Sequence, residues 1–354
     1  MPTGLSKAVS DTIALAQDIV KVQGAIFIKN LLRQKRTSDS TIRIGTSKEQ
    51  VLENLVEAIK EGKIVQSELD EWVRSVEGWG RQHVYLYRVP LKLTKEPIWT
   101  SQTVLKSRLK EAKRSHLLDA PTGVDFPEQL TLASIRGGEE CFEAIWQERL
   151  EQWHYDQSQD PEPKVIDGDL YKFRAYRQQL NRSVMRFAIR PSGHIAGLFV
   201  QIPLSDPKHK VACETARDTL SRLFAWEDLK LVQISKAIKA LDQAELDSQD
   251  SPHGQIVSQH TRFAAGGASV EFEADPAIRD WKRITAVRQV RRALDSNAFI
   301  GDAAKFRVML RSGTGLNRDV IVSLNGRTKR IYLHAQMTAE EVWPVLLQVL
   351  EHGK

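Results

Sequence analysis

Two polar segments that contain proline interrupt this chain of 354 residues, at 156–169 and 247–253. Proline breaks regular backbone hydrogen bonding, so each segment is predicted to be a loop or linker. A chain of this length also exceeds one ordinary hydrophobic core. We therefore predict an α+β protein with several domains. The expected domains are a helical N-terminal domain at 1–90 and a mixed linker and helical region at 91–160. An α+β middle domain with a basic hairpin is expected at 161–250, and a basic α+β C-terminal domain with an antiparallel sheet plus helices at 251–354.

The N-terminal domain is predicted from the helical spacing of its apolar residues and from one capping box, Thr46-Ser47-Lys48-Glu49. Thr46 is expected to cap the N–H of Glu49, whose carboxylate bonds back to the Thr46 amide. The helix that follows is expected to end at Gly62, because glycine readily takes the left-handed conformation beyond a helix. A short helix at 67–76 and a strand at 83–89 complete this domain.

In the middle of the chain, apolar residues at helical spacing predict a helix at 140–153. Residues 184–190 instead alternate, which predicts a strand with apolar residues inward and Arg186 and Arg190 outward. The turn Pro191–His194 then leads into a returning strand at 195–202, so this region is expected to form a hairpin.

The last hundred residues are predicted to form a strand, a basic helix, three further strands and a final helix. The type I′ signal Asn325-Gly326 is expected to join the last two strands. A second capping box at Thr338–Glu341 is expected to open the final helix. The predicted strands and helices lie at 268–273, 277–294, 306–311, 319–324, 328–334 and after 338.

Charge is segregated along the chain. Residues 171–190 carry a net charge of +6 with four aromatic residues and no carboxylate, and residues 279–330 carry +9. The segment 139–169 carries −8. Segregated charge creates a directional field, and arginine interleaved with aromatic rings suits phosphates and bases. We therefore predict contacts with DNA or RNA, chiefly through phosphate.

The predicted nucleic-acid contacts in these two basic segments are arginines for phosphate and tyrosines for stacking. They are Arg174, Arg177, Arg182, Arg186, Arg190, Arg283, Arg288, Arg291 and Arg292, with Tyr171 and Tyr176.

Residues 28–62 are predicted to form a helix, an extended basic loop and a second helix that begins at Gly45–Glu49. This arrangement resembles the helix-loop-helix of SAP-type DNA-binding modules. The pattern Lys48-Glu49, Val51, Leu55, Leu69 and Gln82 is also similar to the helical N-terminal domain of the centromere protein N family, which binds centromeric nucleosomes. Either resemblance implies that phosphate is faced by Arg33, Lys35, Arg36, Arg43 and Lys48.

No residue cluster identifies a reaction. P-loop, Rossmann, zinc-site and esterase-elbow motifs are absent from the sequence, and the two cysteines, Cys141 and Cys213, are predicted to be reduced thiols. His83 is predicted to be structural. Asp167 and Asp169 are close enough to share a magnesium ion, although Asp-Gly-Asp is also a common turn. We predict no catalytic residue, no cofactor and no bound metal.

These observations predict a non-catalytic nucleic-acid-binding adaptor or accessory subunit. One alternative is a protein-interaction scaffold that docks partners through the acidic segment 139–169 and the basic C-terminal region. The other is a metal-dependent nuclease that uses Asp167 and Asp169. No stretch is apolar enough to span a membrane and the N-terminus lacks a secretory signal, so a cytoplasmic location and no membrane partner are expected.

Overall fold

The computed structural model describes residues 7–23, 25–76, 79–120, 127–137, 141–201, 206–247, 256–273, 284–294, 299–308, 316 and 319–352. The fold is α+β, as predicted, with helices and a large antiparallel sheet. The chain divides into two compact units. Unit 1 contains residues 1–69, 123–132 and 146–184, and unit 2 contains the rest. The predicted division at residue 160 therefore falls inside unit 1.

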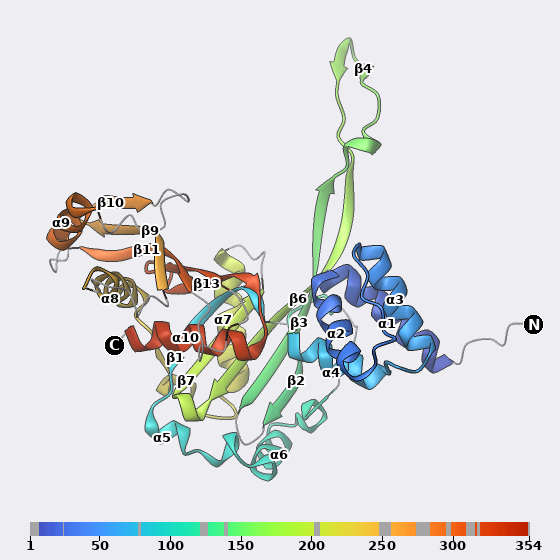
Figure 1. Ribbon diagram of the computed structural model, residues 1–354, viewed down its shortest axis with the longest axis horizontal. Coiled ribbons are helices and arrows are strands. Elements are labelled where there is room, and N and C mark those ends of the chain that lie inside the picture. Colours follow the sequence, from blue (N-terminus) through green and yellow to red (C-terminus); the bar gives the residue numbers. More distant parts are fainter. Residues whose placement is uncertain are drawn as a thin grey trace, which may run out of the picture. The chain divides into compact units, whose positions relative to one another are not determined.

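A group of packed helices forms one part of unit 1 (Figure 1). Helix α3 packs against both α1 and α2, because Ile28, Leu32, Val51 and Leu55 present fully buried apolar side chains. Lys35 and Arg36 lie in the last turn of α2, where the negative end of the helix dipole favours cations. The helices are α1 (Lys7–Gln23), α2 (Ala25–Ser38), α3 (Lys48–Lys60) and α4 (Gln66–Val76), which begins in this unit.

The first predicted capping box is displaced by one residue. Ser47, not Thr46, caps α3, and its side chain accepts a hydrogen bond from the Gln50 amide. The Gln50 side-chain oxygen reaches back to the Thr46 amide at 3.0 Å. Serine and glutamine serve in a capping box as well as threonine and glutamate do, so the sequence admits both registers. The helix ends before Gly62, which has φ of +71° as expected.

Unit 1 also contains most of a long two-stranded hairpin. Its strands are antiparallel, because the Asp156 amide donates to the Ala175 carbonyl at 2.9 Å while Gln178 contacts Glu151 nearer the base. We call residues 151–177 the arm; Figure 1 labels β4 near its tip. The hairpin comprises β3 (Phe142–Tyr155), the 3-10 turn Gln157–Gln159, β4 (Lys164–Ile166), β5 (Asp169–Tyr171) and β6 (Tyr176–Arg190).

The predicted helix at 140–153 is therefore wrong, because these residues form strand β3. Residues 144–147 are all buried, so successive side chains on both faces of the strand are covered. A strand that is buried on both faces loses its apolar-polar alternation, and its pattern then matches a buried helix equally well.

The sheet is built mainly by unit 2, and its strand order is β10-β9-β11-β12-β13-β1-β7-β6-β3-β2, with β8 paired to β1. The hairpin predicted at 184–202 is confirmed: Met185 pairs with Val200 and Arg190 with Ile195. The strands not yet bounded are β1 (Gly80–Arg88), β2 (Thr131–Gly137), β7 (Ile195–Gln201), β8 (Lys230–Leu231), β9 (Ile256–Ala265), β10 (Ala268–Glu273), β11 (Ile300–Val308), β12 (Val320–Asn325) and β13 (Arg330–Gln336).

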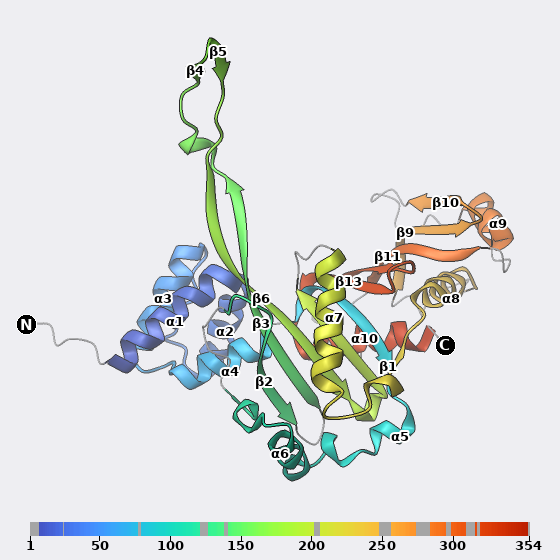
Figure 2. The same cartoon turned by 180° about the vertical axis from the view of Figure 1, so that it is seen from behind.

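Helices cover the two faces of this sheet unequally. On the face that we call the covered face, α8 (Ile234–Asp247) and α10 (Ala339–His352) bury a core from β1, β11, β12 and β13. Helix α7 (Asp206–Leu220) contacts β7 on the opposite side, and Figure 2 shows it in front of the sheet. Arg291 joins α9 (Thr285–Leu294) to the covered face through Asp242 of α8.

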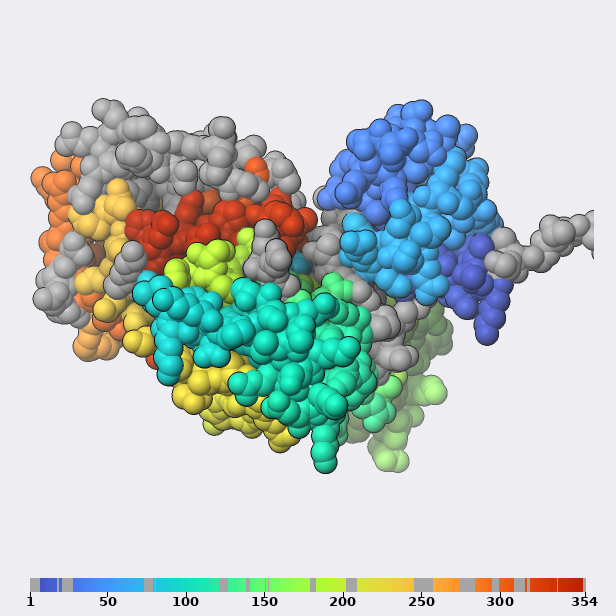
Figure 3. All heavy atoms as spheres, turned by 90° about the horizontal axis from the view of Figure 1, so that it is seen from below, coloured from blue at the N-terminus to red at the C-terminus, as the bar shows by residue number. Residues whose placement is uncertain are grey.

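Residues 91–120 form a continuous outer layer of unit 2 (Figure 3). Trp99 from this layer is fully buried, with its ring edge-on to Phe142 and Phe224 at 5.2 and 4.9 Å between ring centres. The layer contains α5 (Leu91–Thr94), the 3-10 turns Pro97–Trp99 and Ser115–Leu117, and α6 (Gln102–Glu111).

The turns of the C-terminal strands differ from the prediction. The type I′ turn predicted at Asn325-Gly326 is wrong: four residues join β12 to β13, and the left-handed residue is Lys329. Gly326 is needed for space, since a Cβ there would lie 2.1 Å from the Gly301 carbonyl oxygen. One of the two bonds of the second capping box is confirmed, because the Thr338 amide donates to the Glu341 carboxylate at 3.1 Å.

Candidate nucleic-acid interface

One row of side chains crosses five strands on the side of the sheet opposite the covered face. Strand register places His83 beside Tyr332, Tyr332 beside Ser323, Ser323 beside Lys305, and Lys305 beside His260. Their chain neighbours, such as Val84, Ile331, Leu324 and Phe306, lie in the core. Because side chains alternate along a strand, this row points away from the core. We call the exposed part of this side, over β9, β11, β12 and β13, the open face.

Aromatic rings line one end of the open face. Tyr332 lies 5.1 Å from His83 and 4.3 Å from His334, measured between ring centres. His83 in turn meets the buried His209 of α7 edge-on at 4.6 Å. Helix α7 therefore closes this end of the face, while Tyr332 and His334 remain half-exposed. Half-exposed rings on a sheet offer a platform on which unpaired bases stack.

Cations accompany the rings. Lys305 and Arg307 project from β11 and Arg330 from β13, all half-exposed. Neither Lys305 nor Arg307 pairs with a carboxylate in the part of the chain that the structure describes. Strands β9, β12 and β13 contain no Asp or Glu, and β11 contains only the buried Asp302. Beside these strands, the edge strand β10 carries carboxylates, and its Glu271 contacts His260.

The electrostatics of this face favour anion binding over acid–base catalysis. Ser323 Oγ lies 2.7 Å from His334 Nε2, which is the spacing of a nucleophile and its base. Burial, with a contribution from Lys305, lowers the pKa of His334. A base in a nucleophilic mechanism must become cationic, and Lys305 opposes that charge. No carboxylate among the described residues bonds to this imidazole, whereas a catalytic triad requires one.

Two arginines predicted to point outward from β6 lie on the covered face instead. Arg186 is 2% exposed, contacts Glu143 at 2.7 Å, and lies over the Trp79 ring at 4.5 Å. Arg190 is half-buried over Trp343 at 5.3 Å. The alternation of β6 was predicted correctly, but both of its faces are covered at this end. Because Trp79 and Trp343 supply π surfaces, these cations are stabilised inside the protein.

In the basic helix α9, one of the predicted nucleic-acid contacts is also buried inside the protein. Arg291 is 2% exposed, forms an ion pair with Asp242, and lies within 5.2 Å of the ring centres of Phe263 and Phe272. The prediction that it faces solvent is wrong. Arg292 is exposed and Arg288 half-buried, while Arg283 lies outside the described residues.

The remaining predicted contacts from the first basic segment lie on the arm. Tyr171 and Tyr176 are about half exposed, at 46% and 50%. Arg174 and Arg177 are exposed, and the Arg174 guanidinium lies over the Tyr155 ring at 5.5 Å. The side chain of Arg182 lies outside the described set. These residues belong to unit 1 and the open face belongs to unit 2.

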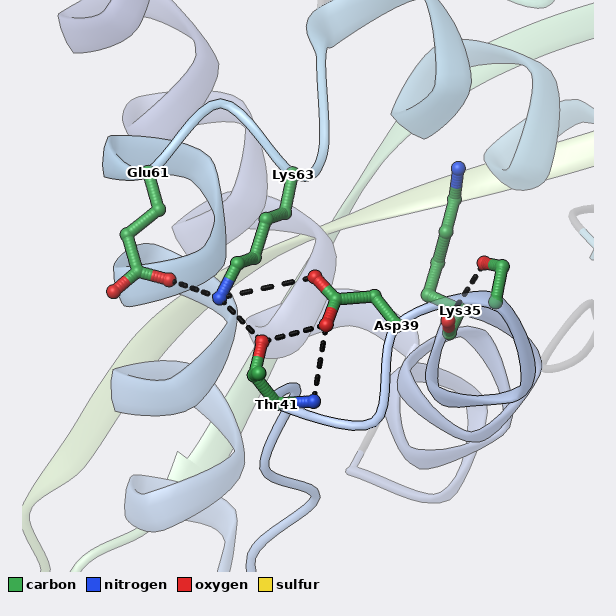
Figure 4. A network of polar contacts seen from close by, with 6 residues as sticks. Lys35, Asp39, Thr41, Glu61 and Lys63 are labelled. Carbon is green, nitrogen blue, oxygen red and sulfur yellow. Dashed lines mark hydrogen bonds and ion pairs between the residues drawn. The ribbon is translucent and has the colours of Figure 1, made fainter.

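The helix-loop-helix at residues 28–62 has a loop fixed by polar contacts (Figure 4). Lys63 Nζ donates to Thr41 at 2.6 Å and pairs with Asp39 and Glu61, while Lys29 donates to the Thr46 carbonyl. The hydrogen bonds from Thr41 lower the pKa of Asp39. Of the residues that the family resemblances implicate, Lys35 pairs with Glu68, and exposed side chains belong to Arg33, Arg36, Arg43 and Lys48.

The carboxylates of the nuclease alternative lie in a tight turn. Asp167 and Gly168 have φ of +52° and +91°, and Ile166 pairs with Asp169 across β4 and β5. Among the described residues, no group of three or more His, Cys, Asp or Glu side chains is arranged to hold a metal ion. Here the motif serves the turn that its composition also predicts.

None of the residues of the open face is among the nucleic-acid contacts predicted from the sequence. The available signal was alternation: Arg330, Tyr332 and His334 share one side of β13, and Lys305 and Arg307 share one side of β11. This alternation does not indicate which strands lie side by side in the sheet.

No protein-family model and no curated protein sequence matches this chain. No helix in the described part of the chain combines the length and apolar character needed to cross a membrane.

Proposed function

We propose that this protein is a non-catalytic, nucleic-acid-binding accessory protein that contacts single-stranded nucleic acid through the open face. The observation that supports the proposal is the combination on one sheet face of adjacent aromatic rings with Lys305, Arg307 and Arg330, without a carboxylate on β12 or β13. Phosphates neutralise the cations and release counterions, while Tyr332 stacks on a base. Stacking on a sheet requires unpaired bases, which favours single strands over duplexes.

Fluorescence anisotropy tests the proposal with labelled single-stranded DNA, duplex DNA and RNA over a salt series. The double variant Lys305→Gln/Arg307→Gln removes two cations from the open face and is expected to weaken binding about tenfold or more. The matched control is Lys106→Gln/Lys110→Gln, which removes two exposed cations from α6. Equal losses in both double variants, or no loss in the first, would reject the open face as the binding surface.

The arm favours a second candidate, a scaffold for protein partners. Eight large apolar or aromatic side chains between Trp153 and Tyr176 are at least 38% exposed. The tip, residues 156–171, contains five carboxylates and one lysine. Such an acidic, apolar tip repels phosphate and suits a protein with a basic surface.

This candidate predicts that the purified chain binds no nucleic acid. It also predicts a partner that co-purifies at low salt, dissociates at high salt, and is lost in the variant Val165→Ser/Leu170→Ser.

A further inference from the structure

A cavity of about 420 Å³ lies at the end of the β9–β10 hairpin in unit 2. Among the described residues that line it, Arg262, Arg327 and Asp302 are the charged ones. The rest of its lining is small, except for Ile300, because the hairpin end from Ala264 to Ser269 contains only Ala, Gly and Ser. A cavity of this size accommodates a small molecule, and its charge decides which class.

Together these three side chains carry an excess of one positive charge. Asp302 is 3% exposed and accepts contacts from Arg262 at 2.5 Å and from Arg327 at 3.3 Å. A buried carboxylate is stable only with such partners. Because Asp302 contacts two guanidinium groups but carries a single negative charge, it neutralises only one of them. Arg327 retains a side-chain exposure of 73%. The Nε atom of Arg262 is buried and has no acceptor among the described residues.

The backbone fixes the position of these arginines. The Gly326 amide donates to the Asp302 carbonyl at 2.8 Å, and the close approach of Gly326 to Gly301 leaves no room for a side chain. Arg327, the next residue, is therefore anchored beside Asp302. On the other side, Gly266 and Gly267 form the two-residue turn between β9 and β10, with φ of +54° and +88°.

We propose that this cavity binds a phosphate monoester group. Guanidinium groups present paired donors that match phosphate oxygens, and a dianion is attracted to the uncompensated charge. Free phosphate, a nucleotide and a phosphorylated nucleic-acid end share this chemistry. The nucleic-acid source rests on the proposed function, since Arg262 lies on the same side of β9 as His260 of the open face. The other two sources do not depend on it.

Titration of the full-length chain with inorganic phosphate, adenosine 5′-monophosphate and adenosine, followed by amide NMR shifts, tests the proposal. Phosphate and the monophosphate are expected to shift amides of the hairpin turn, and adenosine is not. Arg327→Gln is expected to weaken the monophosphate about tenfold or more, while Lys106→Gln is expected to leave it unchanged. No shift at millimolar concentrations, or equal affinity in Arg327→Gln and the unmodified chain, would overturn it.

A second comparison separates the sources and the two proposals. A single strand with a 5′-phosphate is expected to bind more tightly than the same strand with a 5′-hydroxyl, and Arg327→Gln is expected to remove that difference. Equal binding of both strands, with phosphate still bound, assigns the cavity to small phosphates. Phosphate binding without binding of either strand rejects the proposed function and retains this inference.

Discussion

The covered face and the open face of the unit 2 sheet both carry basic side chains, but they use them differently. On the covered face, Arg186 and Arg291 are almost fully buried, and each has a carboxylate and an aromatic ring as partners. On the open face, Lys305 and Arg307 are half-exposed and have no carboxylate partner among the described residues. Net charge by sequence segment does not distinguish these two situations.

The difference follows from the cost of burying charge. A guanidinium removed from water requires an opposite charge or a π surface, so a buried arginine is a structural group with fixed partners. A cation that retains contact with water needs no such partner and remains available to an external anion. Substitutions on each face distinguish a structural cation from an available one.

Asp242→Ala is expected to destabilise the protein by about 3–5 kcal/mol, because it removes a carboxylate that pairs with Arg291, which is buried beside two phenylalanine rings. Urea unfolding followed by circular dichroism measures the change. Lys305→Gln on the open face is the control, with an expected change within about 0.5 kcal/mol. Similar unfolding midpoints for both variants would contradict the proposed difference between the structural cations of the covered face and the available cations of the open face.

Tyr332→Leu is expected to reduce single-strand affinity by about 1–3 kcal/mol, since a leucine side chain does not stack on a base. Tyr332→Phe keeps the ring and is expected to retain most of the affinity. Anisotropy titration at fixed salt measures both. The exposed Tyr171 of the arm provides a matched comparison: a larger loss in Tyr171→Leu than in Tyr332→Leu would move the binding surface to the arm.

Removing the two open-face cations also alters the salt dependence of binding. Each phosphate contact to a single strand contributes about −0.7 to the slope of log affinity against log salt. Lys305→Gln/Arg307→Gln is therefore expected to make the slope less steep by about 1.4. The α6 double variant is expected to keep the original slope. An unchanged slope in the open-face variant would show that these cations do not meet phosphate.

The pKa of His334 reports the field on the open face. Burial and Lys305 hold it below the ordinary value of 6.5, so the fold favours the neutral imidazole. The resulting stability is fully present above pH 6.5 and is lost as the pH falls through the lowered pKa. Imidazole NMR titration is expected to show this pKa rising in Lys305→Gln. A fall in that variant would contradict the assigned field.

Local signals predicted much of the fold. The strand–turn–strand at 184–202, strand 268–273 and the cap at Thr338 depend on alternation, turn residues and a capping box, all of which act within a few residues. The failures have non-local causes. Strand β3 was mistaken for a helix because elements distant in the sequence pack on both of its faces and bury residues 144–147. At Asn325-Gly326, contact with Gly301 determines the turn.

The sequence by itself determined the α+β class, the alternation of β6 and the separation of basic from acidic segments. Only the tertiary structure decided which arginines are enclosed and which strands bring Tyr332, Ser323 and Lys305 into one row. The physical reason is that composition and periodicity act locally along the chain. Exposure depends on helices and strands brought together from distant positions, as Asp242 and Arg291 illustrate.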